Sequence, residues 1–232
     1  MTKNIMTWNT GLTEGSDPKK ALAYIKGFLD EQDNTIAVLE QIPYRLPDDV
    51  VGWSKPIEHP IYTQFMKTFS DYNIFKNTEY NHGCIRMLTV IVTKMTGVLS
   101  LPLVTTNRES AVQLMNSYSL LGLHAKAGAD NAEYLRNLNK YAVVADIALG
   151  DFNAGDYYMC ENRKLFRELL KDHVCICDLP TRVVTCNNNI VRKTCIDHVF
   201  VKNTLVDRVH SLVIHDDINI SDHYPITFCI DD

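Results

Sequence analysis

The sequence predicts a mixed α and β fold, in which strands follow one another and a few helices interrupt them. Short runs rich in Val, Ile and Thr recur along the chain, and such runs are typical of strands. Elsewhere apolar residues recur every three or four positions, which is the spacing of a helix with one buried face. Successive strands interrupted by helices suit two packed sheets with helices on their outer faces.

The chain has 232 residues, enough to bury a substantial core, and it contains no repeat, low-complexity run or long linker. We therefore expect a single domain over residues 1–232. No apolar stretch is long enough to cross a membrane, and residues 1–4 lead into a strand without signal-peptide features. We expect a cytoplasmic protein and a monomer. The net charge of −5 argues mildly against tight non-specific DNA binding, although metal-binding carboxylates would contribute to that charge.

The seven cysteines are an odd number with no regular spacing, and we expect reduced thiols, as in cytosolic proteins. Four of them lie close in the sequence, namely Cys175, Cys177, Cys186 and Cys195. Their spacings match no common zinc motif, so a structural zinc is a minor alternative. A Cys186–Cys195 disulfide across a hairpin is geometrically possible but is disfavoured by the expected compartment.

Helices are expected where a start signal precedes an apolar stripe. Asp17 is a favourable N-cap and Pro18 suits the first helical position, so residues 18–31 are expected to form an amphipathic helix. Three further helices are expected from Pro60, from Asp130 and over residues 160–171. The expected strands are residues 3–8, 35–39, 72–76, 84–94, 97–104, 112–123, 141–149, 195–201, 205–214 and 226–230, with a hairpin turn at 187–189.

The stretch 148–155, Ala-Leu-Gly-Asp-Phe-Asn-Ala-Gly, is the one around which the chain is organised. The apolar run 141–149 leads into a turn at Gly150. Since side chains alternate along an extended chain, Asp151 and Asn153 point the same way and can reach one ligand. A carboxylate beside an amide suits a hydrated cation and a phosphate oxygen. A polar turn without function is the alternative, because Gly, Asp and Asn are common turn residues.

Three further motifs lie at strand ends: Met6-Thr7-Trp8-Asn9-Thr10-Gly11, Cys195-Ile196-Asp197-His198 and Ile220-Ser221-Asp222-His223. Together with Gly150-Asp151-Phe152-Asn153, and in this order, they resemble the endonuclease/exonuclease/phosphatase family, the DNase I-like hydrolases. Each motif alone is weak, but four in the family's order form a specific signal that spans the chain. The resemblance implies an α/β (α+β) fold, a four-layer α/β/β/α sandwich of two packed, mostly antiparallel mixed sheets with flanking helices.

The resemblance also implies a divalent-cation site formed by Glu40, with support from Asn9 and Asp222. Glu40 follows the apolar strand 35–39, and a carboxylate at such a strand end suits a hard cation. The family usually has glutamine before this glutamate, whereas here Gln41 follows it. If Gln41 were the equivalent residue, the metal ligand would be lost.

Two histidines are expected to act on the phosphate. In the family the equivalent of His223 takes a proton from water, and Asp197 holds its other ring nitrogen. His124 resembles the histidine of the DNase I and sphingomyelinase branches and would give a proton or a hydrogen bond to the leaving oxygen. Glu79 is its expected carboxylate partner. His198 follows Asp197 and is expected either to contact substrate or to pack.

These residues imply hydrolysis of a phosphate ester by water, assisted by one or two Mg²⁺ or Mn²⁺ ions. Asp151 and Asn153 would orient the water and the transition state. We expect DNA or RNA as substrate, because His124 and the run 123–141 resemble DNase I-type nucleases. A phosphodiesterase or phosphatase acting on small molecules or lipids is the alternative, since Ile42 stands where those nucleases carry an arginine for groove contacts.

A non-catalytic binding module is a third reading, and it would predict erosion of the polar set that this chain retains. The remaining acidic and histidine residues match no motif of the family. We expect surface or capping roles for Asp146, Asp156, Asp178, Asp216, Asp217, His82, His210 and His215.

Overall fold

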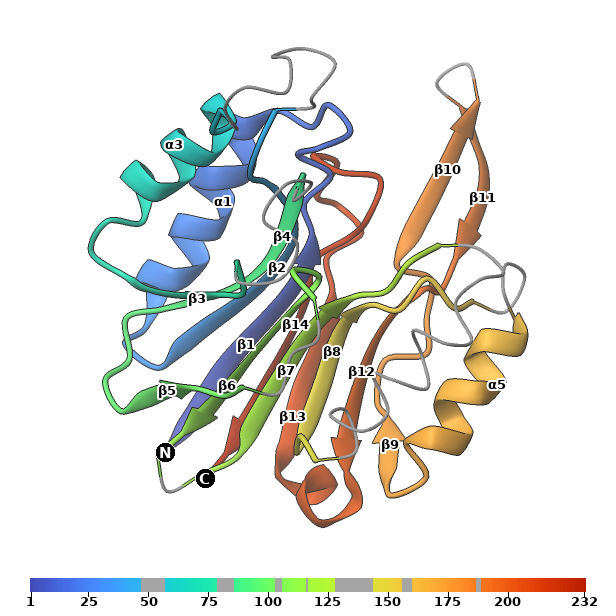
Figure 1. Cartoon of the computed structure of the whole chain (residues 1–232). Coiled ribbons are helices and arrows are strands. Elements are labelled where there is room, and N and C mark those ends of the chain that lie inside the picture. Colours follow the sequence, from blue (N-terminus) through green and yellow to red (C-terminus); the bar gives the residue numbers. More distant parts are fainter. Residues whose placement is uncertain are drawn as a thin grey trace.

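The computed structural model describes residues 1–46, 57–78, 86–102, 106–115, 117–127, 144–155, 160–186 and 189–232. Two six-stranded sheets pack face to face (Figure 1). In spatial order the first contains β13 (Val209–Ile214), β14 (Ile226–Asp231), β1 (Thr2–Asn9), β2 (Thr35–Pro43), β4 (Met87–Thr93) and β3 (Asn73–Lys76). The second contains β5 (Val98–Ser100), β6 (Glu109–Leu114), β7 (Ser119–His124), β8 (Ile147–Asp151), β12 (Asp197–Lys202) and β9 (His173–Cys175).

Apolar cores hold the layers together. Between the sheets, residues such as Val38 of the first pack against residues such as Leu149 of the second. Helices α1 (Pro18–Glu31) and α3 (Pro60–Thr68) cover the outer face of the first sheet, where Ile25 and Phe65 are fully buried. Helix α5 (Cys160–Leu169) covers the second sheet through Phe166. This arrangement confirms the expected four-layer α/β/β/α sandwich.

The helix start signals are confirmed in the described residues. The carboxylate of Asp17 accepts hydrogen bonds from the backbone N–H groups of Lys19 and Lys20, at 2.9 and 3.3 Å, so it caps α1 as predicted. Helix α3 begins at Pro60 and α5 covers most of 160–171. The helix expected from Asp130 lies outside the described residues.

One expected strand, over residues 112–123, is wrong. The segment contains the end of β6 and all of β7, which pair antiparallel around a tight turn. The N–H of Ser117 donates to Leu114 O, and the N–H of Leu114 donates to Tyr118 O, both at 3.1 Å. Leu120 and Leu121 are both fully buried on opposite faces of β7. The segment therefore lacks the alternation of apolar and polar residues that would have marked β7 as a separate strand.

Other strand boundaries also differ. Residues 205–208, expected to be strand, belong to the 3-10 helix η1 (Asn203–Arg208) that precedes β13. Strand β2 does not end at residue 39 but continues to Pro43 through a bulge. Strand β8 begins at Ile147. The preceding residue, Asp146, accepts hydrogen bonds from the backbone N–H and the hydroxyl of Ser119, both at 2.9 Å. This contact confirms a capping role for Asp146.

Three strands were not expected. These are β9 and the antiparallel pair β10 (Arg182–Cys186) and β11 (Asn189–Thr194), which projects beside the second sheet (Figure 1). Residues 187 and 188 of the expected hairpin turn lie outside the described residues. Strand β9 has only three residues, and β10 is largely accessible, so neither carries a strong apolar signal.

Cysteines 175, 177, 186, 195 and 229 are free thiols, so no Cys186–Cys195 bridge is present between these described residues. None of the helices in the described part of the chain has the length and apolar character needed to cross a bilayer.

Candidate active site

Polar side chains finish the core-facing rows of five strands. These five strands carry them at the same end of the sandwich, the upper end of the ribbons in Figure 1. Along each strand every second residue faces the opposite sheet. The rows are apolar in the middle of the core, as with Val38 in β2 and Leu149 in β8. Two residues further on, the side chains become polar. The row ends are Asn9, Glu40, His124, Asp151 and Asp197, each at most 5 % exposed.

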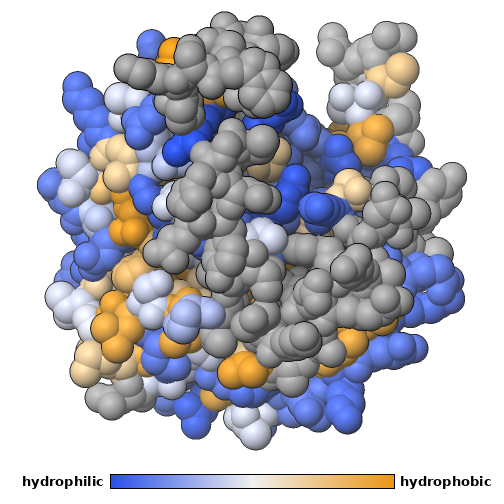
Figure 2. Space-filling view, viewed as in Figure 1, coloured by the Kyte–Doolittle hydropathy of each residue, from blue (hydrophilic) through white to orange (hydrophobic). Residues whose placement is uncertain are grey.

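Strand register sets these row ends side by side. In the parallel pair of β1 and β2, Asn9 lies opposite Glu40. In the second sheet Asp151 lies opposite His124 on one side and opposite Asp197 on the other. Residues directly opposite each other on neighbouring strands share a face of the sheet. Pairing therefore gathers two of these residues in the first sheet and three in the second. Hydrophilic side chains line the hollow between the body of the sandwich and the projecting β10–β11 pair (Figure 2).

Gly150 lets the two sheets meet at this end. Its φ is +132°, and a Cβ added there would lie 2.1 Å from Leu123 O and 2.8 Å from Glu40 Oε1. Only glycine adopts this backbone and tolerates this approach. The carboxylate of Glu40, from the first sheet, therefore contacts the residue before Asp151, from the second.

Asp151 is the centre of the cluster. Its Oδ2 atom accepts a hydrogen bond from Asn9 Nδ2 at 2.9 Å. The Nε2 atoms of His124 and His223 lie 3.6 and 3.9 Å from the same oxygen. Burial raises the pKa of Asp151 to about 6, with Asp197 acting in the same direction and His223 opposing it. One carboxylate oxygen thus faces two imidazoles.

Asn153 lies beside Asp151, but not through the extended geometry expected from the sequence. Asp151 still belongs to β8, and Asn153 has a left-handed φ of +48°, which asparagine tolerates better than most residues. Its backbone N–H donates to Asp151 Oδ1 at 2.8 Å, and its Nδ2 donates to Ala125 O at 2.9 Å. The turn therefore fixes both the Asp151 carboxylate and the Asn153 amide.

Glu40 is a buried carboxylate with the properties of a cation ligand. Its Oε1 accepts a hydrogen bond from Thr7 Oγ1 at 3.0 Å, whereas among the described residues its Oε2 is buried without a hydrogen-bond partner. Burial, together with Asp197 and Asp151, raises the pKa of Glu40 well above its ordinary value. Three acidic groups that repel one another inside the protein, all offering oxygen, fit Mg²⁺ or Mn²⁺.

Gln41 has its φ at +57° in the bulge and points elsewhere. Its side chain accepts a hydrogen bond from Thr13 Oγ1 at 2.9 Å and donates to Glu14 Oε1 at 3.2 Å. Of the two aligned alternatives, Glu40 is the one that faces Asp151.

His223 is held by Asp197. Its Nδ1 lies 2.9 Å from both oxygens of Asp197, and Thr181 Oγ1 donates to Asp197 Oδ2 at 2.6 Å. Burial alone would lower the pKa of His223, but Asp197, Asp151 and Asp222 raise it to about 9. The imidazole is therefore oriented with Nε2 toward Asp151, and it carries a proton at neutral pH unless the surrounding negative charge is offset.

His124 has the opposite electrostatic environment. Its Nδ1 lies 3.4 Å from Arg108 Nη1, and the same guanidinium donates to His124 O at 3.3 Å. Burial, Arg108 and His223 hold the pKa of His124 well below its ordinary value. The ring is neutral at physiological pH and so suits hydrogen bonding better than proton donation. Its expected partner Glu79 lies outside the described residues.

Two of the three expected metal ligands are engaged within the chain. Asn9 donates to Asp151, and its Oδ1 accepts a hydrogen bond from Gly11 N at 3.2 Å, so it orients Asp151. Asp222 is half-buried, and its Oδ2 accepts a hydrogen bond from Arg182 Nε at 2.8 Å. Its Oδ1 lies 3.9 Å from His223 Nε2, which places it at the edge of the cluster.

Comparison with known proteins gives the fold its context. No protein-family model and no curated protein matches the sequence. Among solved structures, the endonuclease domain of TRAS1, a telomere-specific non-LTR retrotransposon, matches with a TM-score of 0.69 and 16% identity over 98% of each chain. The AP endonuclease LMAP from Leishmania major matches with a TM-score of 0.71 and 15% identity, over 100% of this chain and 88% of that one. This chain has the DNase I-like fold.

A third DNase I-like structure, the 3′ phosphatase NExo from Neisseria bound to product DNA hairpin, matches with a TM-score of 0.67 and 15% identity, over 99% of this chain and 100% of that one. These likenesses confirm the fold that the four motifs imply.

Some residues of the polar cluster were not expected from the sequence. Thr181, Arg108 and Arg182 orient Asp197, His124 and Asp222 respectively, yet they lie in unremarkable segments with no motif of their own. His198, for which substrate contact was one expectation, is only 1% exposed and faces away from the cluster. It packs and makes hydrogen bonds on the other side of β12, because adjacent strand residues point to opposite faces.

Proposed function

We propose that the protein is a metal-dependent phosphoesterase that hydrolyses phosphodiester bonds in nucleic acid. The observation that carries the proposal is the convergence of His124 and His223 on Asp151 Oδ2, next to the unpartnered carboxylate oxygen of Glu40. The groups that meet here are two acids, a neutral imidazole and an imidazole held by a carboxylate. Such groups are needed to activate water and to stabilise a phosphoryl centre.

Glu40 and Asp151 are the proposed ligands of Mg²⁺ or Mn²⁺, one ion or two, with Asn9 and Asp222 in support. Atoms of Asp151, Asp197 and His223 also lie within 4.8 Å of one another, close enough for one ion. We favour Glu40 over Asp197, because Asp197 is already bound to His223 and Thr181. When bound, the cation polarises a non-bridging phosphoryl oxygen and stabilises the leaving oxygen.

The protein groups divide the remaining work. His223 removes a proton from water at Nε2 once the charge of Asp151 and Glu40 is offset, and Asp197 stabilises the resulting imidazolium through Nδ1. Asp151, held by Asn9 and Asn153, orients that water. Neutral His124 donates a hydrogen bond to a phosphoryl oxygen.

Nucleic acid is favoured as the substrate by a cavity whose wall contains two arginines, a histidine and one acidic residue, Glu14. The cavity has a volume of about 310 Å³, and its walls include Arg45, Arg86 and His59. It lies next to the segment that follows Glu40, because Pro43 of β2 is also part of its wall. Arginines near the strand that carries Glu40 suit contacts to neighbouring phosphates of a nucleic-acid strand. The similar structures named above are nucleases and a DNA 3′ phosphatase, which supports this choice.

A small-molecule or lipid phosphoesterase is the second candidate. Ile42, which replaces the groove-contacting arginine of DNase I-type enzymes, is fully buried against the helices and cannot contact a substrate. The net charge of −5 also disfavours extensive phosphate contacts.

The test compares three substrates in Mg²⁺ or Mn²⁺ and in EDTA: supercoiled plasmid, bis-para-nitrophenyl phosphate and a phosphoinositide panel. Metal-dependent plasmid nicking is expected, and Asp151→Asn should lower it by at least about 100-fold, because the water loses its orienting carboxylate. Asp216→Asn, a matched change at an exposed aspartate, should nick at the wild-type rate. Melting temperatures of all variants establish that they are folded.

The arms separate the candidates. Turnover of small esters alone would replace the nuclease by the second candidate, and folded protein with no turnover of any substrate would indicate a binding module. Full activity in Asp151→Asn would refute the site itself. Arg86→Gln should weaken plasmid binding while leaving hydrolysis of bis-para-nitrophenyl phosphate unchanged.

A further inference from the structure

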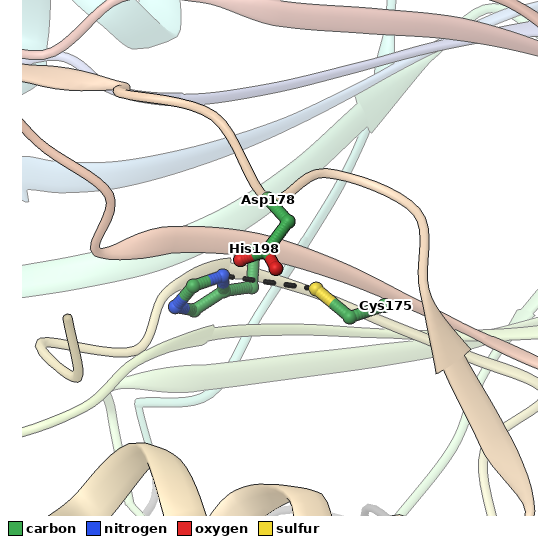
Figure 3. Close-up of side chains that lie close together, drawn as sticks. All are labelled: Cys175, Asp178 and His198. Atoms are coloured by element: carbon green, nitrogen blue, oxygen red, sulfur yellow. Dashed lines mark hydrogen bonds between the residues drawn. The ribbon is translucent and has the colours of Figure 1, made fainter. Parts of the chain in front are cut away.

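A second cluster of metal-ligating side chains lies on the outer face of the second sheet, behind the proposed active site. Cys175 ends β9, His198 lies on β12, and Asp178 follows β9 in the chain (Figure 3). One ligand atom from each of these three residues lies within 4.8 Å of the others. Cys195 joins them, with its Sγ 3.7 Å from His198 Nδ1 and 4.0 Å from Asp178 Oδ1.

The distances from His198 to the two sulfurs are close to those of a tetrahedral zinc site. Zinc binds thiolate sulfur at about 2.3 Å and imidazole nitrogen at about 2.0 Å, so tetrahedral angles separate S and N by about 3.5 Å. His198 Nδ1 lies 3.8 Å from Cys175 Sγ and 3.7 Å from Cys195 Sγ. Two sulfurs are thus already near the required distance from one nitrogen.

The imidazole of His198 is set up as a ligand by its other nitrogen. Its Nε2 lies 2.7 Å from Ala154 O, a contact in which Nε2 carries the hydrogen. Burial lowers the pKa of His198, so the ring is neutral. With the hydrogen on Nε2, the lone pair is on Nδ1, which also lies 3.4 Å from Cys177 O. A backbone carbonyl that fixes the tautomer in this way is the usual partner of a metal-bound histidine.

The remaining groups balance the charge. Arg163 and Arg167 both form ion pairs with Asp178, the latter at 2.9 Å. A carboxylate ligand that is itself hydrogen-bonded is typical of protein metal sites. Burial raises the pKa of Cys195 to about 12 and raises that of Cys175, so without a cation both thiols keep their protons. Such thiols are poor nucleophiles, which disfavours a catalytic or redox role.

We propose that Cys175, Cys195, His198 and Asp178 form a structural zinc site, separate from the Mg²⁺ or Mn²⁺ site. Binding exchanges one Zn²⁺ for the two thiol protons, which pass to solvent, and nothing is oxidised. The sequence spacing alone hides the site, because His198 and Asp178 are contributed by motifs that read as catalytic or surface segments.

The position of the cluster would let a bound zinc stabilise the active site. His198 is the neighbour of Asp197, which holds His223, and it bonds to Ala154, which follows the turn that holds Asp151. Phe152, within that turn, packs edge-to-face on His198 with ring centroids 5.6 Å apart. A metal on the back of β12 therefore clamps together the two segments that carry Asp151 and Asp197.

The test measures zinc in the full-length protein, not its activity. Protein made in zinc-supplemented medium and cleared of loosely held metal should retain one zinc per chain by elemental mass spectrometry. Cys175→Ser should lose most of it, and Cys186→Ser, which removes an exposed thiol, should keep it. Co²⁺ titrated into metal-free protein should give tetrahedral thiolate–cobalt absorption in wild type and Cys186→Ser, and not in Cys175→Ser.

The outcomes are decisive in both directions. Less than a tenth of an equivalent of zinc in folded wild type, with no cobalt spectrum, would overturn the proposal. So would a Cys175–Cys195 disulfide found by peptide mass spectrometry in freshly purified protein. Equal zinc content in Cys175→Ser, Cys195→Ser and wild type would show that the bound metal lies elsewhere.

Discussion

At the scale of single residues, the site consists of ionisable groups that burial has moved away from their ordinary behaviour. Glu40 and Asp151 are acids whose pKa values are raised, and His223 is a base whose pKa is raised to about 9. In each case the protein disfavours an accumulation of negative charge. A bound cation should therefore stabilise the cluster, and this difference can be measured.

Glu40→Gln should stabilise the metal-free protein. A carboxylate whose folded pKa exceeds its unfolded value of about 4.3 contributes stability below that pH and loses it as pH rises toward the folded pKa. The variant should therefore match wild type at pH 4 and exceed it at pH 8 by about 1–3 kcal/mol, the cost of an unsatisfied buried group. Urea unfolding in EDTA at both pH values measures the difference.

The same variant should lose stabilisation by metal. Mg²⁺ should raise the melting temperature of wild type and leave that of Glu40→Gln unchanged. Glu168→Gln, an exposed glutamate on α5, provides the matched control and should behave as wild type at both pH values. A variant less stable than wild type at pH 8 in EDTA would contradict the electrostatic interpretation of this residue.

At the scale of elements, side chains alternate between the two faces of each strand. One face contributes to the inter-sheet core and the active site, and the other contributes to the cluster of Cys175, Asp178, Cys195 and His198. The sheets approach closely where β7 crosses β2, because Gly122 has no side chain. A Cβ there would lie 2.3 Å from Val38 Cγ1. This close approach brings the polar row ends of both sheets within reach of one another.

Gly122→Ala should separate the sheets and destabilise the fold by about 1–3 kcal/mol, the usual cost of overpacking a core. Gly27→Ala, within α1 and with open space around it, should instead stabilise by about 0.5–1 kcal/mol, because alanine is the better helix former. Urea unfolding of both variants gives the two signs. Equal stability of Gly122→Ala and wild type would show that the sheets can adjust without cost.

How much of each element could be predicted depended on local signals. Helix α1 was predicted to the residue because Asp17 and Pro18 mark its start. The turn between β6 and β7 was missed because apolar residues continue through both strands. The motif residues were predicted to gather because the resemblance supplied their order. The side toward which His198 points could not be predicted, because it depends on which face of β12 packs against the first sheet. That is a property of the tertiary structure, and a single sequence does not reveal it.

At the scale of the whole molecule, the C-terminal strands pack beside the N-terminal strand. Strands β13 and β14 come last in the sequence, yet they complete the first sheet beside β1. Asp232 forms ion pairs with Lys3 and with the amino group of Met1, the latter at 3.3 Å. The inter-sheet core includes residues from both sheets. No single cut in the sequence separates the two layers, and the single domain over residues 1–232 stays a prediction.

Unfolding should accordingly occur in one cooperative transition. Trp8 is 1% exposed and packs against Tyr24 beneath α1, so its fluorescence reports on the first sheet. In a Trp53→Phe background, urea curves from Trp8 fluorescence and from far-ultraviolet circular dichroism should coincide. Two separated midpoints would mean that the sheets unfold independently and would refute the single domain.

One peptide bond, between Asp197 and His198, joins residues that serve opposite sides of the same strand. Deleting or inserting a single residue between Cys195 and Asp197 would turn the following segment over, so that Asp197 would leave the side of the active site and His198 would take its place there. Length variation should therefore be tolerated in the hairpin that precedes this strand and rejected within it. A library of random one-residue insertions and deletions would reveal that boundary as an abrupt change from active, folded variants to inactive ones.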